Sequence, residues 1–500
     1  MRLIPALSVL MLLLCSPALA EPHGDEVSSR IDALFDHLEE HQLFRGAALV
    51  ADGGLPVYTT ARGLADEAWS IPNSVDTRYR IASLSKQFAA VVALQLADEG
   101  RISLDDPVAK YVGELPEAWS GKVAVRHLLN QTSGIPDYTL LPGYRDGLST
   151  QRFTREEFLQ LICGDSLFAE TRFEPGSDWE YSNTNYFLLG VLIDRAAGAS
   201  YEDELRRRIL APLEMHDSGI YDSREPVSML AEGYELTYEG KVERPAHSEF
   251  SPKSVPSGGI YSTVRDMLKW CAALSDGSLL TPAMDEVFTT PTLHIGEDIG
   301  YACGQWCESH ESPDGERLQI FSHGGSTTGM STWLLRVPAD GRCVVLLHNG
   351  GSAREMFLEQ VALTVLEILE GGEGELPPLD LVGPLASTYL NHPDSLFDHY
   401  RLLKERHREV YDFRPEQLSM IGQLLIQRVG DRETAAAVFR LNVEEYPDAP
   451  LAHRDLGAFL LEEGLREQAL EHLLRARELT VEPGEELDAM IVRARSGVSP

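Results

Sequence analysis

Ser83-Leu84-Ser85-Lys86 brings a hydroxyl and an amine together at the start of an apolar segment, 84–99, that predicts a buried helix. Side chains three residues apart lie on the same face of a helix, so we expect the Lys86 amine beside the Ser83 hydroxyl. A serine hydroxyl is a poor nucleophile until a base takes its proton, and the lysine and the helix N-terminus favour that step. Alone, Ser-x-x-Lys also occurs by chance as a helix cap with a surface lysine.

Two further segments accompany this pair in order along the chain. Tyr181-Ser182-Asn183 follows a Glu-Pro-Gly turn at 174–176, and His323-Gly324-Gly325-Ser326 follows a strand predicted to end at Ser322. The ordered triple of Ser-x-x-Lys, Tyr-x-Asn and His-x-Gly resembles the penicillin-recognising serine hydrolases of the class C β-lactamase type. That family also includes D,D-carboxypeptidases, D-aminopeptidases and family VIII-like esterases. The resemblance covers roughly Ile31 to Leu369, and three further stretches support it: 127–135, 185–190 and 257–263.

The resemblance implies a chemical role for the first two motifs. Ser83 would be the acylated nucleophile, and Lys86 and Tyr181 would be a hydrogen-bonded pair that takes its proton and passes it to the leaving group. Lysine and tyrosine side chains both titrate near 10, so one pKa must be shifted for work at neutral pH. Because an ammonium stabilises a neighbouring phenolate, we expect the pKa of Tyr181 to be lowered.

The remaining motif residues would hold the substrate. Asn183 would orient the lysine and the substrate. The backbone N–H groups of Ser83 and Ser326 would form an oxyanion hole, in which one donor is worth about 3 kcal/mol of activation free energy. Gly324-Gly325 carries no Cβ, so the strand edge can approach the acyl group closely.

His323 marks a departure from the β-lactamases of the family, which carry Lys-Thr-Gly or Lys-Ser-Gly on this strand. There a cation and a hydroxyl grip a carboxylate, whereas His323 is expected to be neutral or partly charged near pH 7 and Gly324 offers no hydroxyl. Ser326, Thr327 and Thr328 would compensate only in part. We therefore predict hydrolysis of an amide or ester through an acyl-enzyme, of the D,D-peptidase, D-aminopeptidase or esterase type. A true β-lactamase and a catalytically silent, penicillin-binding-like interaction protein are the alternatives.

Strand patterns at both ends of the family-like region enclose a helical segment. A hairpin is predicted at 46–51 and 55–60, helical segments at 101–290, and further strands at 301–307, 318–322, 331–337 and 343–349. Helices at 27–42 and 353–370 flank these strands. The prediction is an α/β fold of the β-lactamase/transpeptidase type, in which an antiparallel sheet built from both ends is flanked by helices and carries an inserted helical lobe.

Beyond a Gly- and Pro-rich linker at 371–378, the sequence is helical and repeats with a period of 34 residues. The period resembles the tetratricopeptide repeat, of which about two units are present. We therefore expect three parts, namely a signal peptide at 1–20, a serine hydrolase domain at 21–375 and a helical repeat region at 376–500 that is either a stabilising extension or a surface for a protein partner. The repeated positions are Gly430, Ala435, Phe439 and Glu444, followed by Gly464, Ala469, Leu473 and Glu478.

The N-terminus and the charge restrict the location and the partners. Arg2 precedes an apolar run, 3–15, and the small-residue pattern Ala18-Leu19-Ala20, which together predict a cleaved export signal and a periplasmic or secreted protein. Cys15 leaves a lipoprotein as the lesser alternative. No later segment is long and apolar enough for a membrane span. A formal net charge of −35 repels phosphate backbones, which excludes nucleic acid as a partner. The resemblance implies a small-molecule or peptide-like substrate.

Neither metal nor cofactor is expected. Five cysteines remain after residue 20, an odd number that favours buried thiols or a single disulfide over a disulfide framework. Cys303 and Cys307 would lie about 13 Å apart along one strand, and with His310 they lack a fourth metal ligand. His37 and His41 match one metallopeptidase string, yet they fall on the polar face of the first helix.

Overall fold

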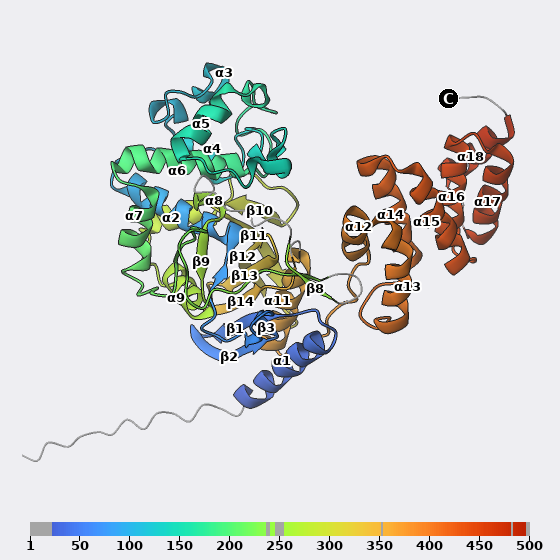
Figure 1. Cartoon of the computed structure of the whole chain (residues 1–500), viewed down its shortest axis with the longest axis horizontal. Coiled ribbons are helices and arrows are strands. Elements are labelled where there is room, and N and C mark those ends of the chain that lie inside the picture. The colour runs from blue at the N-terminus through green and yellow to red at the C-terminus, as the bar shows by residue number, and fades with distance from the viewer. Residues whose placement is uncertain (1–22, 237–240, 246–254, 352–353, 482–483, 497–500) are drawn as a thin grey trace, which may run out of the picture.

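The computed structural model describes residues 23–236, 241–245, 255–351, 354–481 and 484–496, so the predicted signal peptide lies outside the described residues. A seven-stranded antiparallel sheet with the order β10-β11-β12-β13-β14-β1-β2 occupies the centre of the hydrolase-like part (Figure 1). The N-terminal hairpin pairs with the last strand, which confirms that one sheet is built from both ends. The strands are β1 (Gly46–Asp52), β2 (Leu55–Arg62), β10 (Ile299–Ala302), β11 (Gln305–Glu311), β12 (Arg317–Thr327), β13 (Met330–Val337) and β14 (Arg342–His348).

Two predicted strand boundaries were wrong. The segment predicted as one strand, 301–307, is the hairpin of β10 and β11, with a turn at Cys303 and Gly304 whose φ angles are 48° and 86°. The predicted spacing of Cys303 and Cys307 along a single strand is therefore also wrong. In addition, β12 does not end at Ser322 but continues to Thr327, because its glycines stay paired with β13. The His-x-Gly motif thus lies within a strand.

Helices cover both faces of the sheet. Alternate residues of β1 point to opposite sides: Ala47 and Leu49 join the cluster of the inserted lobe, while Ala48 and Val50 face α1 (His23–Glu40) and α11 (Glu355–Leu369). The predicted apolar stripe of the first helix is buried against this second face.

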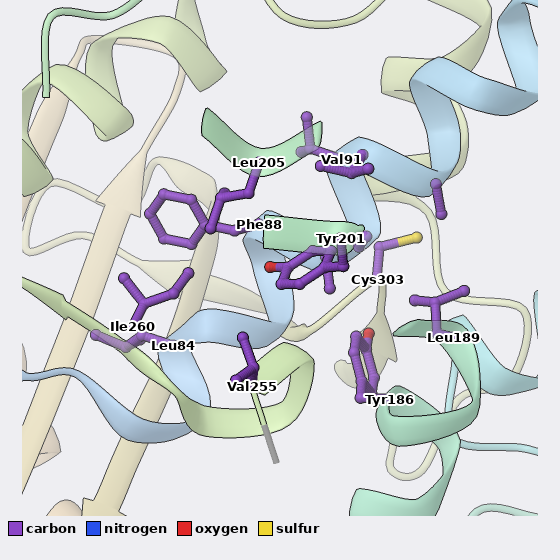
Figure 2. Close-up of a cluster of buried hydrophobic side chains, with 14 of the residues drawn as sticks. Leu84, Phe88, Val91, Tyr186, Leu189, Tyr201, Leu205, Val255, Ile260 and Cys303 are labelled. Atoms are coloured by element: carbon purple, nitrogen blue, oxygen red, sulfur yellow. The ribbon is translucent and has the colours of Figure 1, made fainter. Parts of the chain in front are cut away.

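The inserted lobe lies between β2 and β10 and surrounds α2 (Ser85–Asp98), which is buried along most of its length. Phe88 stacks on Trp270 with a centroid distance of 3.9 Å, and Figure 2 shows α2 side chains meeting those of α6 and α7. This packing fixes the start of α2, where Ser83 lies. The other helices of the lobe are α3 (Glu117–Ser120), α4 (Val125–Leu129), α5 (Arg155–Gly164), α6 (Asn183–Ala197), α7 (Tyr201–Leu205), α8 (Val255–Gly258), α9 (Val264–Ser275) and α10 (Pro282–Thr289). Short strands complete it: β3 (Leu64–Asp66), β4 (Ile71–Pro72), β5 (Tyr79–Arg80), β6 (Gly219–Ile220), β7 (Glu235–Leu236), β8 (Val242–Glu243) and β9 (Ile260–Ser262).

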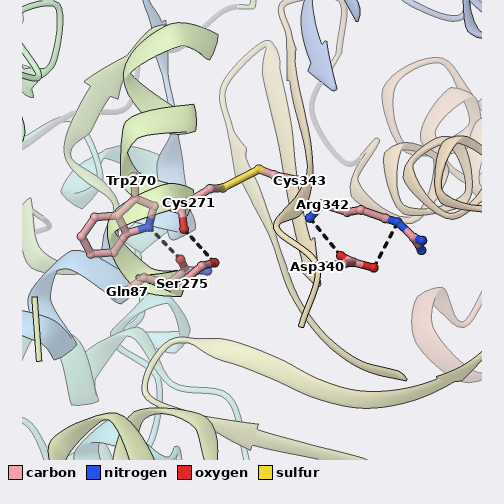
Figure 3. The surroundings of a disulfide bond; sticks show 7 residues. All are labelled: Gln87, Trp270, Cys271, Ser275, Asp340, Arg342 and Cys343. Atoms are coloured by element: carbon pink, nitrogen blue, oxygen red, sulfur yellow. Dashed lines mark hydrogen bonds and ion pairs between the residues drawn. A yellow bond between two sulfur atoms is a disulfide. The ribbon is translucent and has the colours of Figure 1, made fainter. Parts of the chain in front are cut away.

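A disulfide joins Cys271 of α9 to Cys343 of β14 and ties the lobe to the sheet (Figure 3). Among the described cysteines, Cys163, Cys303 and Cys307 are free. The sequence analysis favoured buried thiols or a single disulfide, and the described residues contain one disulfide.

The C-terminal part is helical, as predicted, and lies to one side of the hydrolase-like part (Figure 1). Gly422 packs against Phe439 in the same way that Gly457 packs against Leu473, so Gly422 is the equivalent of Gly457, although the 34-residue period would place Gln423 there. A π-helical turn at Leu425–Val429 accommodates the one extra residue. The helices are α12 (Val382–Asn391), α13 (Leu396–Arg406), α14 (Pro415–Leu424), α15 (Arg432–Glu445), α16 (Pro450–Glu462), α17 (Arg466–Leu479) and α18 (Glu485–Ser496). None of the helices in the described part of the chain is both long and apolar enough to cross a bilayer.

Candidate active site

Ser83 lies in a short 3-10 turn, Ala82–Leu84, that leads directly into α2. Its Oγ is 3.0 Å from the Lys86 Nζ and 3.0 Å from the Tyr181 hydroxyl. Ala82 has a φ of 46°, an uncommon conformation for a residue with a side chain. The structure therefore brings Lys86 and Tyr181 from two distant motifs onto the Ser83 hydroxyl. The predicted hydrogen bond between Lys86 and Tyr181 is not among the contacts of the described residues, and the lysine Nζ lies 4.9 Å from the centroid of the tyrosine ring.

Lys86 is fully buried, and its Nζ also donates hydrogen bonds to Asn183 Oδ1 at 2.8 Å and to the Ser257 carbonyl at 2.7 Å. Burial lowers the pKa of Lys86 to about 7, with Asp137 and Glu355 opposing the shift. A neutral amine has two N–H donors and one lone pair. With Asn183 and Ser257 accepting the two donors, the lone pair is left for the proton of the Ser83 hydroxyl.

The pKa of Tyr181 is shifted in the direction opposite to the one predicted from the sequence. Burial raises the pKa of Tyr181 above its ordinary value, and only the hydrogen bond with Ser83 opposes this. The predicted lowering was wrong because burial of the phenol outweighs the nearby amine, whose Nζ lies 4.9 Å from the ring centroid. The lysine, not the tyrosine, carries the pKa shifted toward neutrality.

Asp137 holds the Tyr-x-Asn motif in place. Its Oδ2 accepts hydrogen bonds at 2.9 Å from both the backbone N–H and the side-chain amide of Asn183, at the start of α6. This leaves the amide oxygen of Asn183 directed at Lys86. The sequence analysis missed Asp137, although it stands two residues after the supporting stretch 127–135.

His323 is buried on β12, with 4% of its surface exposed. Nδ1–H donates to the Gly324 carbonyl, and Nε2 lies 3.0 Å from the Tyr301 hydroxyl, which donates to it when the ring is neutral. Burial, with a contribution from Lys86, lowers the pKa of His323 to about 3. This agrees with the expectation of a neutral group in place of the lysine of the β-lactamases.

Gly325 allows β12 to pass directly against the nucleophile. A Cβ at this position would lie 2.4 Å from the Ile81 carbonyl oxygen and 3.2 Å from the Ser83 nitrogen. Such approaches leave no room for a side chain. Ser326, the next residue, lines the same cavity as Ser83. An oxyanion hole formed by the backbone N–H groups of both serines requires this proximity.

A cavity of about 520 Å³ opens beside Ser83. Its walls include three carboxylates that the sequence analysis missed, Glu308 of β11 and Glu355 and Glu359 of α11. In the sequence, the only sign of this acidic wall is the four-residue spacing of Glu355 and Glu359, which places both on one face of a helix. The complete lining is Ser83, Tyr181, Ile299, Trp306, Glu308, His323, Gly324, Ser326, Trp333, Glu355, Met356 and Glu359.

Candidate metal ligands do not converge. Across the described ranges, no group of three or more His, Cys, Asp or Glu side chains is arranged to hold a metal ion. His37 is exposed on α1, and the His41 Nδ1 lies 3.2 Å from the Nδ1 of His407.

Comparisons with known proteins identify relatives that share the fold of the hydrolase-like part. Penicillin-binding protein 4* of Bacillus subtilis is 30% identical over 359 residues, which cover 69% of this chain and 77% of that protein. The crystal structure of a penicillin-binding protein from Bacillus halodurans is similar with a TM-score of 0.57 and 27% identity, covering 66% of this chain and 98% of that one. D-amino acid amidase from Ochrobactrum anthropi SV3 gives the same TM-score and identity, covering 69% and 99%.

The family match spans the structural unit that holds the cavity. The β-lactamase family model matches residues 31–364, a range that contains the whole seven-stranded sheet and the inserted lobe. The chain therefore belongs to the β-lactamase family of serine hydrolases, which includes the penicillin-binding proteins.

Proposed function

We propose that this protein is an exported serine hydrolase that acts through an acyl-enzyme on an amide or ester, of the D,D-peptidase, D-aminopeptidase or esterase type. The observation that carries the proposal is the 3.0 Å contact between Ser83 Oγ and the buried Lys86 Nζ. A buried amine with a pKa of about 7 is partly unprotonated at neutral pH, which is the form that a general base needs.

In the proposed reaction, neutral Lys86 takes the proton of the Ser83 hydroxyl while Oγ attacks the substrate carbonyl. The N–H groups of Ser83 and Ser326 stabilise the developing oxyanion. The proton then passes through Lys86 and the Tyr181 hydroxyl to the leaving amine or alcohol, and the acyl-enzyme forms. Water, which gives a proton to the same pair, attacks the carbonyl of the acyl-enzyme. The bond from this carbonyl to Ser83 Oγ then breaks, the carboxylic acid leaves, and Oγ regains a proton from the pair.

Amide or ester hydrolysis is favoured over β-lactam hydrolysis. His323 is neutral and Gly324 supplies no hydroxyl, so β12 lacks the cation that would hold the carboxylate of a β-lactam. Amidases and penicillin-binding proteins are both among the similar proteins.

Export and the division of the chain are part of the proposal. The disulfide between Cys271 and Cys343 supports an oxidising compartment, in agreement with the signal predicted at 1–20 and a periplasmic or secreted protein. We place the hydrolase domain at 21–375. The helical region at 376–500 would be a repeat module of the tetratricopeptide type with a surface for a protein partner.

A fluorophosphonate probe followed by mass spectrometry tests the proposed nucleophile. We expect an adduct on Ser83, no adduct in Ser83→Ala, and turnover of p-nitrophenyl acetate that the same change abolishes. Ser309→Ala, on β11 outside the cavity, is the matched control and keeps the adduct. Equal labelling and turnover in Ser83→Ala would show that another residue reacts.

A further inference from the structure

We propose that a second cavity, between the hydrolase-like part and the C-terminal helices, binds an organic anion, namely a small molecule that carries a carboxylate on an apolar body. This junction cavity has a volume of about 460 Å³, and of the residues that line it only Met356 also lines the catalytic cavity. Cavities of this size at the junction of two parts of a chain are common sites for small ligands. The inference goes beyond the proposed function, because the ligand is not the substrate of Ser83.

Both parts of the chain build the wall of the junction cavity. The hydrolase-like part contributes the residues that follow α1, the strand β7 and the first turns of α11, whereas the C-terminal part contributes α12 and α13. Much of the wall is apolar: Leu43 and Phe357 come from the first part, and Leu379 and Leu403 come from the second. A ligand with an apolar body would therefore pack against both parts at once.

Two guanidinium groups supply positive charge to this wall. Arg354 precedes the first residue of α11 and Arg406 is the last residue of α13, so each part of the chain contributes one arginine. Neither guanidinium has a carboxylate within 4.0 Å or a hydrogen-bond acceptor among the described residues. Their nitrogens are not among the buried atoms that lack a partner, so they remain accessible to a ligand. Arginine binds carboxylates through two parallel hydrogen bonds, and these free groups suit a ligand that brings a carboxylate.

The histidines of the wall show that the two arginines act on one region. Burial lowers the pKa of His399 to about 4, and Arg354 and His407 add to this lowering. Burial also lowers the pKa of His407, and His41 and Arg406 act on it in the same direction. The His41 and His407 rings meet with their Nδ1 atoms 3.2 Å apart. Positive charge from both parts of the chain therefore gathers at the junction cavity, where an anion would be stabilised.

The two acids of the wall do not occupy the arginines. Asp380 Oδ1 accepts a hydrogen bond at 2.9 Å from the Gly383 backbone N–H. Glu235 lies near Arg354, because a Cβ at Gly351 would contact both side chains, yet the two form no ion pair within 4.0 Å, and Glu235 is engaged elsewhere. The carboxylate of a ligand can therefore take the guanidinium groups that these acids leave unpaired.

Isothermal titration calorimetry of the full chain with three matched probes tests the proposal: phenylbutyrate, phenylbutyramide and phenylbutylamine. The probes share an apolar body and differ in carrying a negative charge, no charge or a positive charge. We expect saturable binding of phenylbutyrate that is at least about tenfold tighter than binding of the amide, and weakest binding of the amine. Binding of phenylbutyrate that is no tighter than that of the amide, or no saturable binding up to about 10 mM, would overturn the proposal.

Substitution of the arginines assigns the binding to the junction cavity. Arg354→Gln and Arg406→Gln should each weaken binding of phenylbutyrate at least about fivefold and leave binding of the amide unchanged, and a cooperative melting transition shows that each variant is folded. Arg401→Gln, on the same helix as Arg406 but outside the cavity, is the matched control and keeps the affinity. Unchanged affinity in both cavity variants would refute the inference. Saturating phenylbutyrate should also leave Ser83 open to the fluorophosphonate probe, and full protection of Ser83 would place the ligand in the catalytic cavity instead.

Discussion

The pH dependence of acylation follows from the burial of Lys86, whose pKa is lowered to about 7. If the neutral amine is the base, the active fraction of the free enzyme is about 1% at pH 5, half at pH 7 and about 90% at pH 8. The second-order rate constant kcat/KM should therefore rise about 90-fold between pH 5 and pH 8. It should then stay level to about pH 9, because burial raises the pKa of Tyr181 above its ordinary value.

Initial rates with p-nitrophenyl acetate measure this profile, and rates of Ser83→Ala at each pH give the background to subtract. The ester carries no charge, so its own ionisation does not contribute. A profile that falls with increasing pH would mean that the ammonium form is required. A midpoint near 10 would mean that burial does not shift the lysine. Either result would refute the reasoning.

Two variants separate Lys86 from the carboxylates around it. Glu359 also has a pKa of about 7 and could produce the same pH dependence. If Lys86 is the titrating group, kcat/KM of Glu359→Gln must still increase between pH 5 and pH 8. The negative charge of Glu355 favours the ammonium form of Lys86, and Glu355→Gln should therefore move the midpoint to lower pH. Loss of the rise in Glu359→Gln would assign the titration to the glutamate instead.

Three further predictions concern the scaffold. Gly325→Ala should lower kcat/KM for p-nitrophenyl acetate about 100-fold, because its Cβ would collide with the Ile81 carbonyl and displace β12 from the nucleophile; a loss below about threefold would contradict this. The double variant Cys271→Ala/Cys343→Ala should lose about 4 kcal/mol of unfolding free energy in urea, since the bond closes a loop with a sequence separation of 72, and an unchanged midpoint would contradict it. A chain that ends at Glu375 should keep Ser83 labelling but melt at lower temperature, because an apolar cluster continues from the sheet into the C-terminal helices; loss of labelling would contradict the proposed division.

The sequence predicted those features that depend on local chemistry. Ser83 and Lys86 are three residues apart on one helix, and their contact follows from helix geometry alone. β1, β13 and β14 are buried on both faces and therefore appear in the sequence as continuous apolar runs, so the sheet built from both ends was predictable.

The missed features depend on the surroundings and not on the local sequence. Gly304 allowed a turn in the middle of an apolar run, and the paired glycines of β12 resembled a strand end because glycine has low strand propensity. The direction of the pKa shift of Tyr181 is set by burial, which no spacing reveals. The acidic wall comes from β11 and α11, two segments that only the fold places beside Ser83.

The two departures from penicillin recognition act in the same direction. On β12, neutral His323 removes the cation that would hold a carboxylate. On α11, Glu355 and Glu359 add negative charge to the same cavity, which repels a carboxylate and attracts an ammonium group. Both features therefore disfavour an anionic substrate and agree with the proposed hydrolysis of an amide or ester that carries no carboxylate. The proposed acylation depends on the contacts of Ser83 with Lys86 and Tyr181, which require no carboxylate on the substrate.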